Sequence, residues 1–170
     1  SYIQSQGEWS DFMAFYSGFF NSKGLDRTYT AEDFCDYLGS IICNGIQAQY
    51  GDCFKLASNG LAVTLGSGKA WINGHYFISN DSYSIDLTHY RDSINPRYVS
   101  IGIVLDTAEA VRDVKIEVIP GVPAENPTVP DILAGGMRTC LHLYAVRIDP
   151  GMSAVGKIID WIPLDSSDTG

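Results

Sequence analysis

The sequence predicts a mainly β protein, an antiparallel β-sandwich or barrel-like body that carries an N-terminal α-helical segment. Three observations predict this class. Two Asn-Gly pairs stand between short apolar runs, which is the strongest local signal for a β-hairpin because both turn positions need a positive φ. After Gln47 the apolar residues recur with a period near two, as in half-buried strands. Before Gln47 their period is near 3.6, as in a helix.

Length and charge limit the possible partners. The chain has 170 residues, of which 45% are hydrophobic and 18% charged, so we expect one globular domain with a small appendage. Its 11 basic and 20 acidic residues give a net charge of −9. This excess of acid disfavours nucleic acid and anionic membrane surfaces as partners, because both attract basic proteins. No apolar run is long enough to cross a bilayer, so we expect no membrane insertion.

We divide the chain into an attachment segment over residues 1–46, an antiparallel β domain over 47–164 and a linker-like tail over 165–170. The attachment segment is helical and rich in aromatic residues. Within it, residues 8–20 place large apolar side chains at helical spacing: Trp9, Phe12, Met13, Tyr16, Phe19 and Phe20. So many aromatic side chains need a surface to cover them. That surface is either the chain's own domain or a neighbouring subunit.

A second helix is predicted to begin after Thr30, an N-cap residue, with Glu32 and Asp33 in its first turn. Asn44-Gly45 is the expected end of this helix. Its apolar stripe, which we expect to be buried, consists of Phe34, Tyr37, Leu38, Ile41 and Ile42.

The rest of the chain alternates between strand and turn patterns. One hairpin is expected around Ser58-Asn59-Gly60 and a second around Asn73-Gly74. Further strands are predicted over residues 83–87, 98–105, 111–119, 141–148 and 158–162, which gives about seven or eight strands in all. Four prolines within residues 120–130 predict an extended crossing that stays outside the sheets. A short helical turn is expected within 131–137.

The four cysteines stand at positions 35, 43, 53 and 140 and form no C-x-x-C pair. This spacing disfavours a zinc ribbon and a thioredoxin-type motif. Cys35 and Cys43 are eight residues apart in a helical pattern, so both are expected to point inward. We expect buried free thiols in a reducing compartment.

The motifs of common catalytic sites are missing. Residues 66–70 (GSGKA) suggest a phosphate loop but lack the Ser or Thr that follows the lysine. The sequence has no G-x-S-x-G, no H-E-x-x-H and no EF-hand loop. His75, His89 and His142 are isolated in the sequence. We therefore assign no catalytic, cofactor-binding or metal-ligating residue, expect no cofactor, and do not expect an enzyme.

Two clusters leave alternatives open. The acidic residues Asp106, Glu109, Asp113 and Glu117 form either a calcium site or, as we favour, a solvated hairpin end relieved by Arg112 and Lys115. Five aromatic residues on or near strands could stack on sugars or belong to the core: Trp71, Tyr76, Tyr83, Tyr90 and Tyr98.

The order of several motifs resembles that of tail and baseplate proteins from phages and prophages of Gram-positive bacteria. Residues 26–34 (DRTYTAEDF) and the helix that ends in Asn44-Gly45 resemble the family's "DR-Y-AEDF…NG" opening. Three further stretches resemble its hairpin, strand and crossing: residues 68–76 (GKAWINGHY), 97–106 (RYVSIGIVLD) and 119–130. Residues 144–148, followed by Gly151, resemble its closing strand. Segment 8–20 has no counterpart in this pattern.

This resemblance implies a structural component of a phage tail tip or baseplate, located in the virion after synthesis in the bacterial cytoplasm. Such proteins form homo-oligomers, often trimers, so we expect a trimer. Their N-terminal part attaches to the tail, and a distal receptor-binding or fibre region meets the host surface and its glycans. The family supplies no catalytic residues. The alternative function is a carbohydrate-binding module for a host cell-surface glycan. A hydrolase would need paired carboxylates in a groove, and the sequence gives no sign of them.

Overall fold

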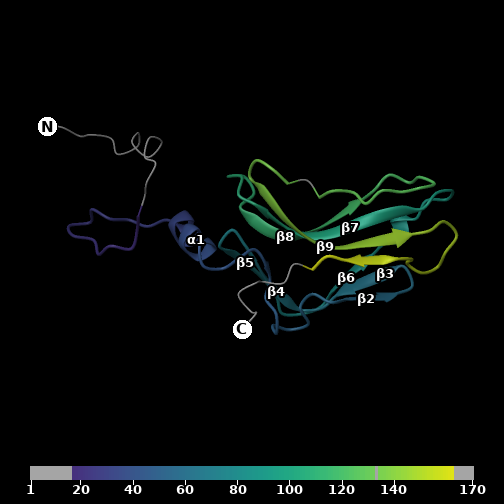
Figure 1. Ribbon diagram of the computed structural model, residues 1–170, viewed down its shortest axis with the longest axis horizontal. Helices are drawn as coiled ribbons and strands as arrows, with labels where there is room; N and C mark the ends of the chain where they lie inside the picture. The colour runs from purple at the N-terminus through teal and green to yellow at the C-terminus, as the bar shows by residue number, and fades with distance from the viewer. Residues whose placement is uncertain (1–16, 133, 163–170) are drawn as a thin grey trace.

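A computed structural model describes residues 17–132 and 134–162. It confirms a mainly β protein with three antiparallel sheets and a short α-helix near the N-terminus (Figure 1). No helix within the described ranges is long and apolar enough to cross a membrane.

Helix α1 (Ala31–Gly39) begins where the sequence predicts. The Thr30 hydroxyl accepts a hydrogen bond from the Asp33 N–H at 3.3 Å, and the Asp33 carboxylate accepts one from the Thr30 N–H at 2.7 Å. This reciprocal capping box satisfies two backbone groups that a helix start otherwise leaves open. The predicted end at Asn44-Gly45 is wrong, because the helix stops at Gly39 and a turn follows.

Two three-stranded sheets are built around the predicted hairpins. In the first, β1 (Gly45–Ile46), β4 (Gly68–Ile72) and β5 (His75–Ser79) lie in the order β1-β4-β5. Asn73 and Gly74 join β4 to β5 with φ of 47° and 77°, as a type I′ turn requires. In the second, the order is β2 (Leu56–Asn59), β3 (Ala62–Leu65) and β6 (Tyr83–Asp86). Its turn falls at Gly60-Leu61, slightly later than predicted.

The third sheet has four strands in the order β10-β9-β7-β8. These are β7 (Arg97–Asp106), β8 (Asp113–Pro120), β9 (Arg138–Ile148) and β10 (Ile158–Asp160). A 3₁₀ turn, η2 (Thr88–Tyr90), precedes β7. The proline-rich residues 121–130 lie outside the strands, as predicted, but Pro120, the first of the four prolines, is the last residue of β8. The helical turn predicted within 131–137 is absent from the described residues of that stretch, where Gly135 instead forms a bridge with Arg138.

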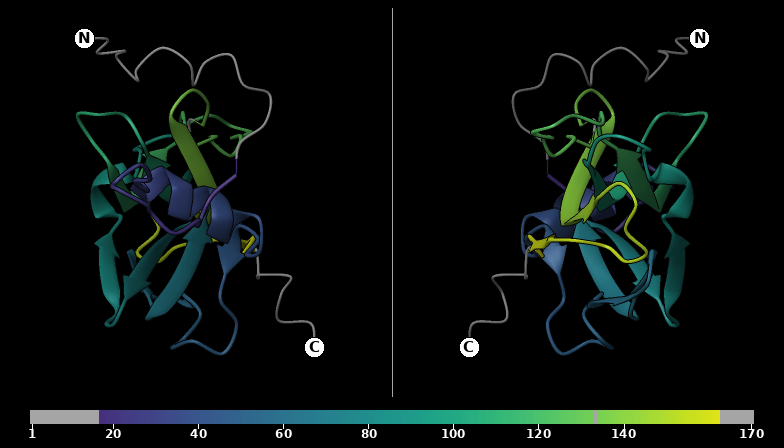
Figure 2. Two further views of the ribbon diagram at one scale, coloured as in Figure 1. Left: turned by 90° about the vertical axis from the view of Figure 1, so that its left-hand side faces the viewer. Right: turned by 90° about the vertical axis from the view of Figure 1, so that its right-hand side faces the viewer.

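The core lies between the four-stranded sheet and the two smaller sheets, which form a sandwich-like body (Figures 1 and 2). Its largest fully buried side chains are Phe54, Ile46, Leu65, Ile72, Leu87, Ile101, Ile103, Leu143 and Ile148. Tyr144 crosses this core, where its hydroxyl donates to the Phe54 carbonyl at 3.1 Å and accepts from the Leu56 N–H at 3.2 Å. Burial raises the pKa of Tyr144 to about 12.

Residues 17–30, called the arm below, project with α1 from one end of the β body (Figure 1). Residues 17–20 are not helical, so the final part of the helix predicted over 8–20 is wrong. The earlier part of that prediction lies outside the described residues.

Candidate functional site

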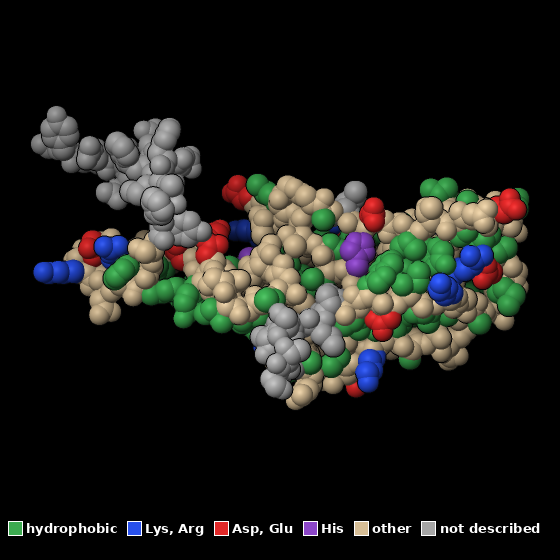
Figure 3. Space-filling view, viewed as in Figure 1, with side chains coloured by type: hydrophobic (Ala, Val, Ile, Leu, Met, Phe, Trp, Pro, Cys, Tyr) green, Lys and Arg blue, Asp and Glu red, His purple; other side chains and the backbone are tan. Residues whose placement is uncertain are grey.

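The apolar stripe of α1 faces solvent, against our prediction. Phe34, Tyr37 and Ile41 are 53%, 51% and 58% exposed. Leu38 and Ile42 are only half-buried. The physical reason is the position of α1, which projects from the end of the body and has no sheet to cover that stripe (Figure 1). Figure 3 shows apolar side chains gathered along the underside of the arm and helix.

The arm folds back onto α1 through an aromatic cluster. The Phe19 ring centroid lies 5.2 Å from that of Tyr29, 5.4 Å from Phe34 and 4.9 Å from Tyr37. The Tyr29 hydroxyl donates to the Phe20 carbonyl at 3.1 Å. Aromatic pairs at these distances stabilise a contact beyond the area that they bury. The arm and the helix therefore form one unit.

This unit presents a group of large apolar side chains to solvent, which we call the arm–α1 face. Its members are Phe19, Phe20, Leu25, Phe34, Tyr37 and Ile41. Single exposed apolar residues are common, but monomeric proteins rarely expose them in large contiguous patches. An exposed aromatic cluster of this kind is typical of a surface that another protein covers.

The Asn73-Gly74 turn connects this unit to the β body. The Asn73 N–H donates to the Asn44 side-chain oxygen at 2.6 Å, and the Asn44 amide donates to the Asn73 side-chain oxygen at 2.8 Å. A Cβ atom at Gly74 would overlap the carbonyl group of Cys35 in α1. The glycine thus provides both the positive φ of the turn and the space for the helix.

A Cys–His contact also joins α1 to β5. The Cys35 Sγ lies 3.5 Å from the His75 Nε2, and the His75 Nδ1 lies 3.2 Å from the Asn73 carbonyl oxygen. A neutral His75 that donates from Nδ1 leaves Nε2 to accept the thiol hydrogen. Burial raises the pKa of Cys35, and the charges of Asp36 and Glu32 raise it further. A nucleophilic cysteine needs the opposite shift, and the observed contact joins α1 to β5.

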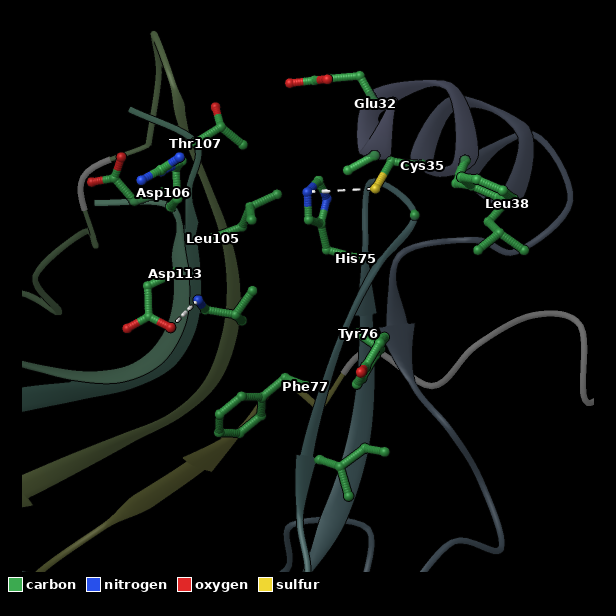
Figure 4. Close-up of a pocket in the computed structure, with 16 residues that line it drawn as sticks. Glu32, Cys35, Leu38, His75, Tyr76, Phe77, Leu105, Asp106, Thr107 and Asp113 are labelled. Atoms are coloured by element: carbon green, nitrogen blue, oxygen red, sulfur yellow. Dashed lines mark hydrogen bonds between the residues drawn. The ribbon is translucent and has the colours of Figure 1, made fainter. Parts of the chain in front are cut away.

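A groove of about 830 Å³ opens beside this link. Its walls come from α1, from the edge of β5 and from the adjoining ends of β7 and β8. In Figure 4, His75 and Cys35 point toward one another, and Phe77 points toward the wall that carries Asp113. Sequence reasoning did not find this groove, because its walls are distant in the sequence and none of them carries a motif.

The other two histidines lie in separate environments. His89 packs against Tyr90, with ring centroids 3.9 Å apart. His142 lies edge-to-face with Trp161 at 5.9 Å. In the described part of the chain, no three histidine, cysteine or acidic side chains are grouped so that they could hold a metal ion.

Two members of the acidic cluster, Asp106 and Glu117, contact an arginine from β9. Arg138 contacts Glu117 at 2.6 Å and Asp106 at 3.5 Å, and Lys115 lies 3.6 Å from Glu117. This arrangement fits a hairpin end whose charges are partly neutralised. Lys115 takes part as predicted, whereas no ion pair of Arg112 is recorded among the described residues. The sequence interpretation missed Arg138, which the pairing of β7 with β9 places opposite Asp106.

Among the five candidate aromatic residues, Trp71 and Tyr76 lie directly opposite one another on β4 and β5. Their ring centroids are 6.4 Å apart, and both side chains reach solvent. The Lys69 ammonium lies 4.5 Å from the Trp71 ring centroid and 5.9 Å from that of Tyr50. Tyr83 belongs to another sheet, and Tyr90 and Tyr98 are half-buried.

All four cysteines are free. Cys35, Cys53 and Cys140 are half-buried, whereas Cys43 is exposed, so the prediction that Cys43 points inward is wrong. Cys43 follows the end of α1 and no longer shares its periodicity.

Comparisons with protein-family models, with curated proteins and with solved structures find no match to this chain. The resemblance to tail and baseplate proteins therefore stays a prediction from the sequence.

Proposed function

We propose that this protein is a structural component of a phage or prophage tail tip or baseplate. In this role it joins a receptor-binding or fibre region to the tail by protein–protein assembly. The observation that carries the proposal is the arm–α1 face, where six large apolar side chains stand in solvent. Covering them on a partner or a second copy removes apolar area from water, which is the main driving force of association.

The position of this face agrees with what the resemblance implies. The arm and α1 form the N-terminal end of the described chain and project from the body (Figure 1). In the family that the sequence resembles, the N-terminal part attaches to the tail. The β body would then face away from the attachment point.

Immunogold electron microscopy tests this role. Tailed particles from the bacterium that carries the gene are labelled with an antibody raised against the β body. We expect gold at the tail tip or baseplate. Particles that carry no label, from a lysate in which the protein is abundant in the soluble fraction, would contradict the proposal.

A second candidate function, recognition of a cell-surface glycan, is favoured by the Trp71–Tyr76 pair. Both rings reach solvent on the same face of β4 and β5, and Lys69 lies over Trp71. Aromatic faces combined with a nearby hydrogen-bond donor are suited to a sugar ring.

A glycan array distinguishes this candidate. The wild-type chain should bind a defined set of glycans, and Trp71→Ala should abolish the signal. Tyr83→Ala is the matched control, because Tyr83 is an exposed aromatic residue on a different sheet. An array without binding, or equal binding by both variants, excludes a sugar site on this face.

A further inference from the structure

The groove beside α1 follows the free edge of β5. Five consecutive residues, Gly74 to Ile78, line it. Alternate residues of a strand line a face, so a consecutive run shows that the groove lies along the strand's edge. Within the described residues, β5 pairs with β4 alone.

The backbone of β5 presents unused hydrogen-bonding groups to this groove. In a two-residue hairpin, the residues that flank the turn form a hydrogen-bonded pair, and here these are Ile72 and His75. The N–H and C=O groups of Tyr76 and Ile78 therefore point away from β4. No backbone or side-chain partner satisfies them among the described residues. They can pair with one more strand.

The shape of the groove determines which kind of strand fits. Phe34 and Leu38 of α1 form one wall, and Leu105 and Val114 form part of the opposite wall. A sheet edge from a second copy brings its own neighbouring strands and so needs more room between these walls than a single strand does. A single extended segment can enter, with its apolar side chains facing the walls.

The charge at the groove favours a basic segment. Among the described residues, Glu32 and Asp113 line the groove with no recorded ion pair, Asp106 is paired with Arg138 from outside the lining, and Arg112 is the one lysine or arginine that lines it. The chain as a whole carries a net charge of −9.

Two other edge strands, β8 and β2, are better protected against such pairing. The edge strand β8 carries Lys115 and Glu117 and ends in Pro120, which are common devices against edge association. On the edge strand β2, the Leu56 N–H donates to the Tyr144 hydroxyl. Strand β5 (HYFIS) contains no lysine or proline and keeps its edge in an open groove.

We propose that this groove is a binding site for an extended, apolar segment of another protein with flanking Lys or Arg residues. The segment adds to β5 as an extra strand, with main-chain hydrogen bonds to Tyr76 and Ile78. Strand addition of this type derives affinity from the backbone and specificity from the side-chain pockets.

A synthetic peptide tests the proposal with the full chain. The probe is acetyl-KVTVTVK-amide, and the charge control is acetyl-EVTVTVE-amide. We expect the basic probe to bind in isothermal titration and to slow the hydrogen exchange of the Tyr76 and Ile78 amides. The acidic peptide should bind at least about tenfold more weakly, a difference of 1.4 kcal/mol.

Three variants separate the contribution of the Ile78 backbone N–H to binding from that of the Ile78 side chain. Ile78→Pro removes the outward N–H but leaves the pairing with β4, since proline is tolerated on a strand edge. It should weaken binding about tenfold or more. Ile78→Ala keeps the N–H and should weaken binding less. Ser58→Pro makes the same change at an outward position of the β2 edge and should leave binding unchanged. Circular dichroism checks that each variant is folded.

Three results would overturn this inference. The first is an absence of binding by the basic probe at millimolar concentration. The second is equal binding by wild type and a folded Ile78→Pro variant. The third is slow exchange of the Tyr76 and Ile78 amides in the free chain at every concentration, because this would show that the chain's own residues already cover the edge.

Discussion

Tyr144 illustrates how single residues hold this sandwich together. Its hydroxyl joins the Phe54 carbonyl and the Leu56 N–H, just before and at the start of β2, to strand β9 in the opposite layer. Sequence patterns place Tyr144 in a strand but cannot identify these two partners, which are 90 and 88 residues away. By contrast, Asn73-Gly74 was predictable because the requirement for positive φ is local.

Tyr144→Phe should lower the free energy of unfolding by about 1 to 3 kcal/mol, because it leaves a part-buried N–H and a buried C=O without their partner. Urea denaturation measures this change. Tyr83→Phe is the control, since Tyr83 is half-exposed, and should change stability by less than about 0.5 kcal/mol. Equal stability of wild type and Tyr144→Phe would contradict the role given to this hydroxyl.

Cys140 should make stability fall in alkaline solution. Burial raises its pKa from 9.0 to about 11 in the folded chain. Between these values the unfolded thiol loses its proton first, so unfolding is favoured as pH rises. The contribution of the protonated Cys140 thiol to the free energy of unfolding is complete below pH 9 and is lost as pH rises through about 11.

Thermal unfolding between pH 8 and pH 11.5, at about half-unit intervals, measures this loss. Cys140→Ala should show a shallower decline than the wild type over the same range, and Cys43→Ala, at an exposed position, should decline like the wild type. Parallel curves for wild type and Cys140→Ala would show that the thiol does not contribute.

At the scale of elements, α1 shows both the reach and the limit of sequence patterns. Its start was predictable because the Thr30 cap and the acidic first turn are local signals. Its periodicity predicted a buried stripe, yet Phe34 and Tyr37 face solvent. An amphipathic pattern indicates only that the apolar face of a helix is buried. It does not distinguish burial against the same chain from burial against another protein.

The strands lie close to the positions predicted from the alternation of apolar and polar residues. Their arrangement into three sheets could not be predicted from that alternation. Pairing depends on contacts between distant segments, such as that of β1 with β4. The irregularity between Ile101 and Gly102, where β7 shifts register against β9, also has no local signal. The groove along β5 depends on this arrangement and was therefore not predictable from the sequence.

Gly74→Ala should loosen α1 from the β body. The new methyl group meets the Cys35 carbonyl group and also forces alanine into a φ of 77°. Gly151→Ala is the matched control, because its φ of 73° is similar and a Cβ atom there would meet no atom of the described residues within 4 Å. Both should pay the backbone penalty of about 1 to 2 kcal/mol.

Denaturant unfolding should show a larger loss for Gly74→Ala than for Gly151→Ala, and hydrogen exchange of the α1 amides should rise only in the former. Equal losses, with α1 equally protected in both variants, would show that the Asn73-Gly74 turn does not hold the helix.

At the scale of the whole molecule, the chain combines a covered core with an uncovered end. The body has an apolar core buried between its sheets, while the arm and α1 expose a cluster of large apolar side chains. The low charged fraction of 18% and the net charge of −9 predict that nucleic acid is not a partner. Composition predicted these exclusions, but the location of the apolar surface required the fold.

Sedimentation equilibrium tests most directly whether the arm–α1 face is an assembly surface. The account predicts a wild-type mass near three times the 18.6 kDa of one chain. Tyr37→Glu combined with Ile41→Glu should reduce this mass to that of one chain, because charges cannot be buried unpaired in an apolar interface.

The control combines Ile94→Glu with Val122→Glu, which are 77% and 80% exposed and lie near the other end of β7 and β8. This control should keep the wild-type mass. A wild-type chain that remains at 18.6 kDa at every concentration, or a Tyr37→Glu/Ile41→Glu variant with an unchanged oligomeric mass, would contradict the account.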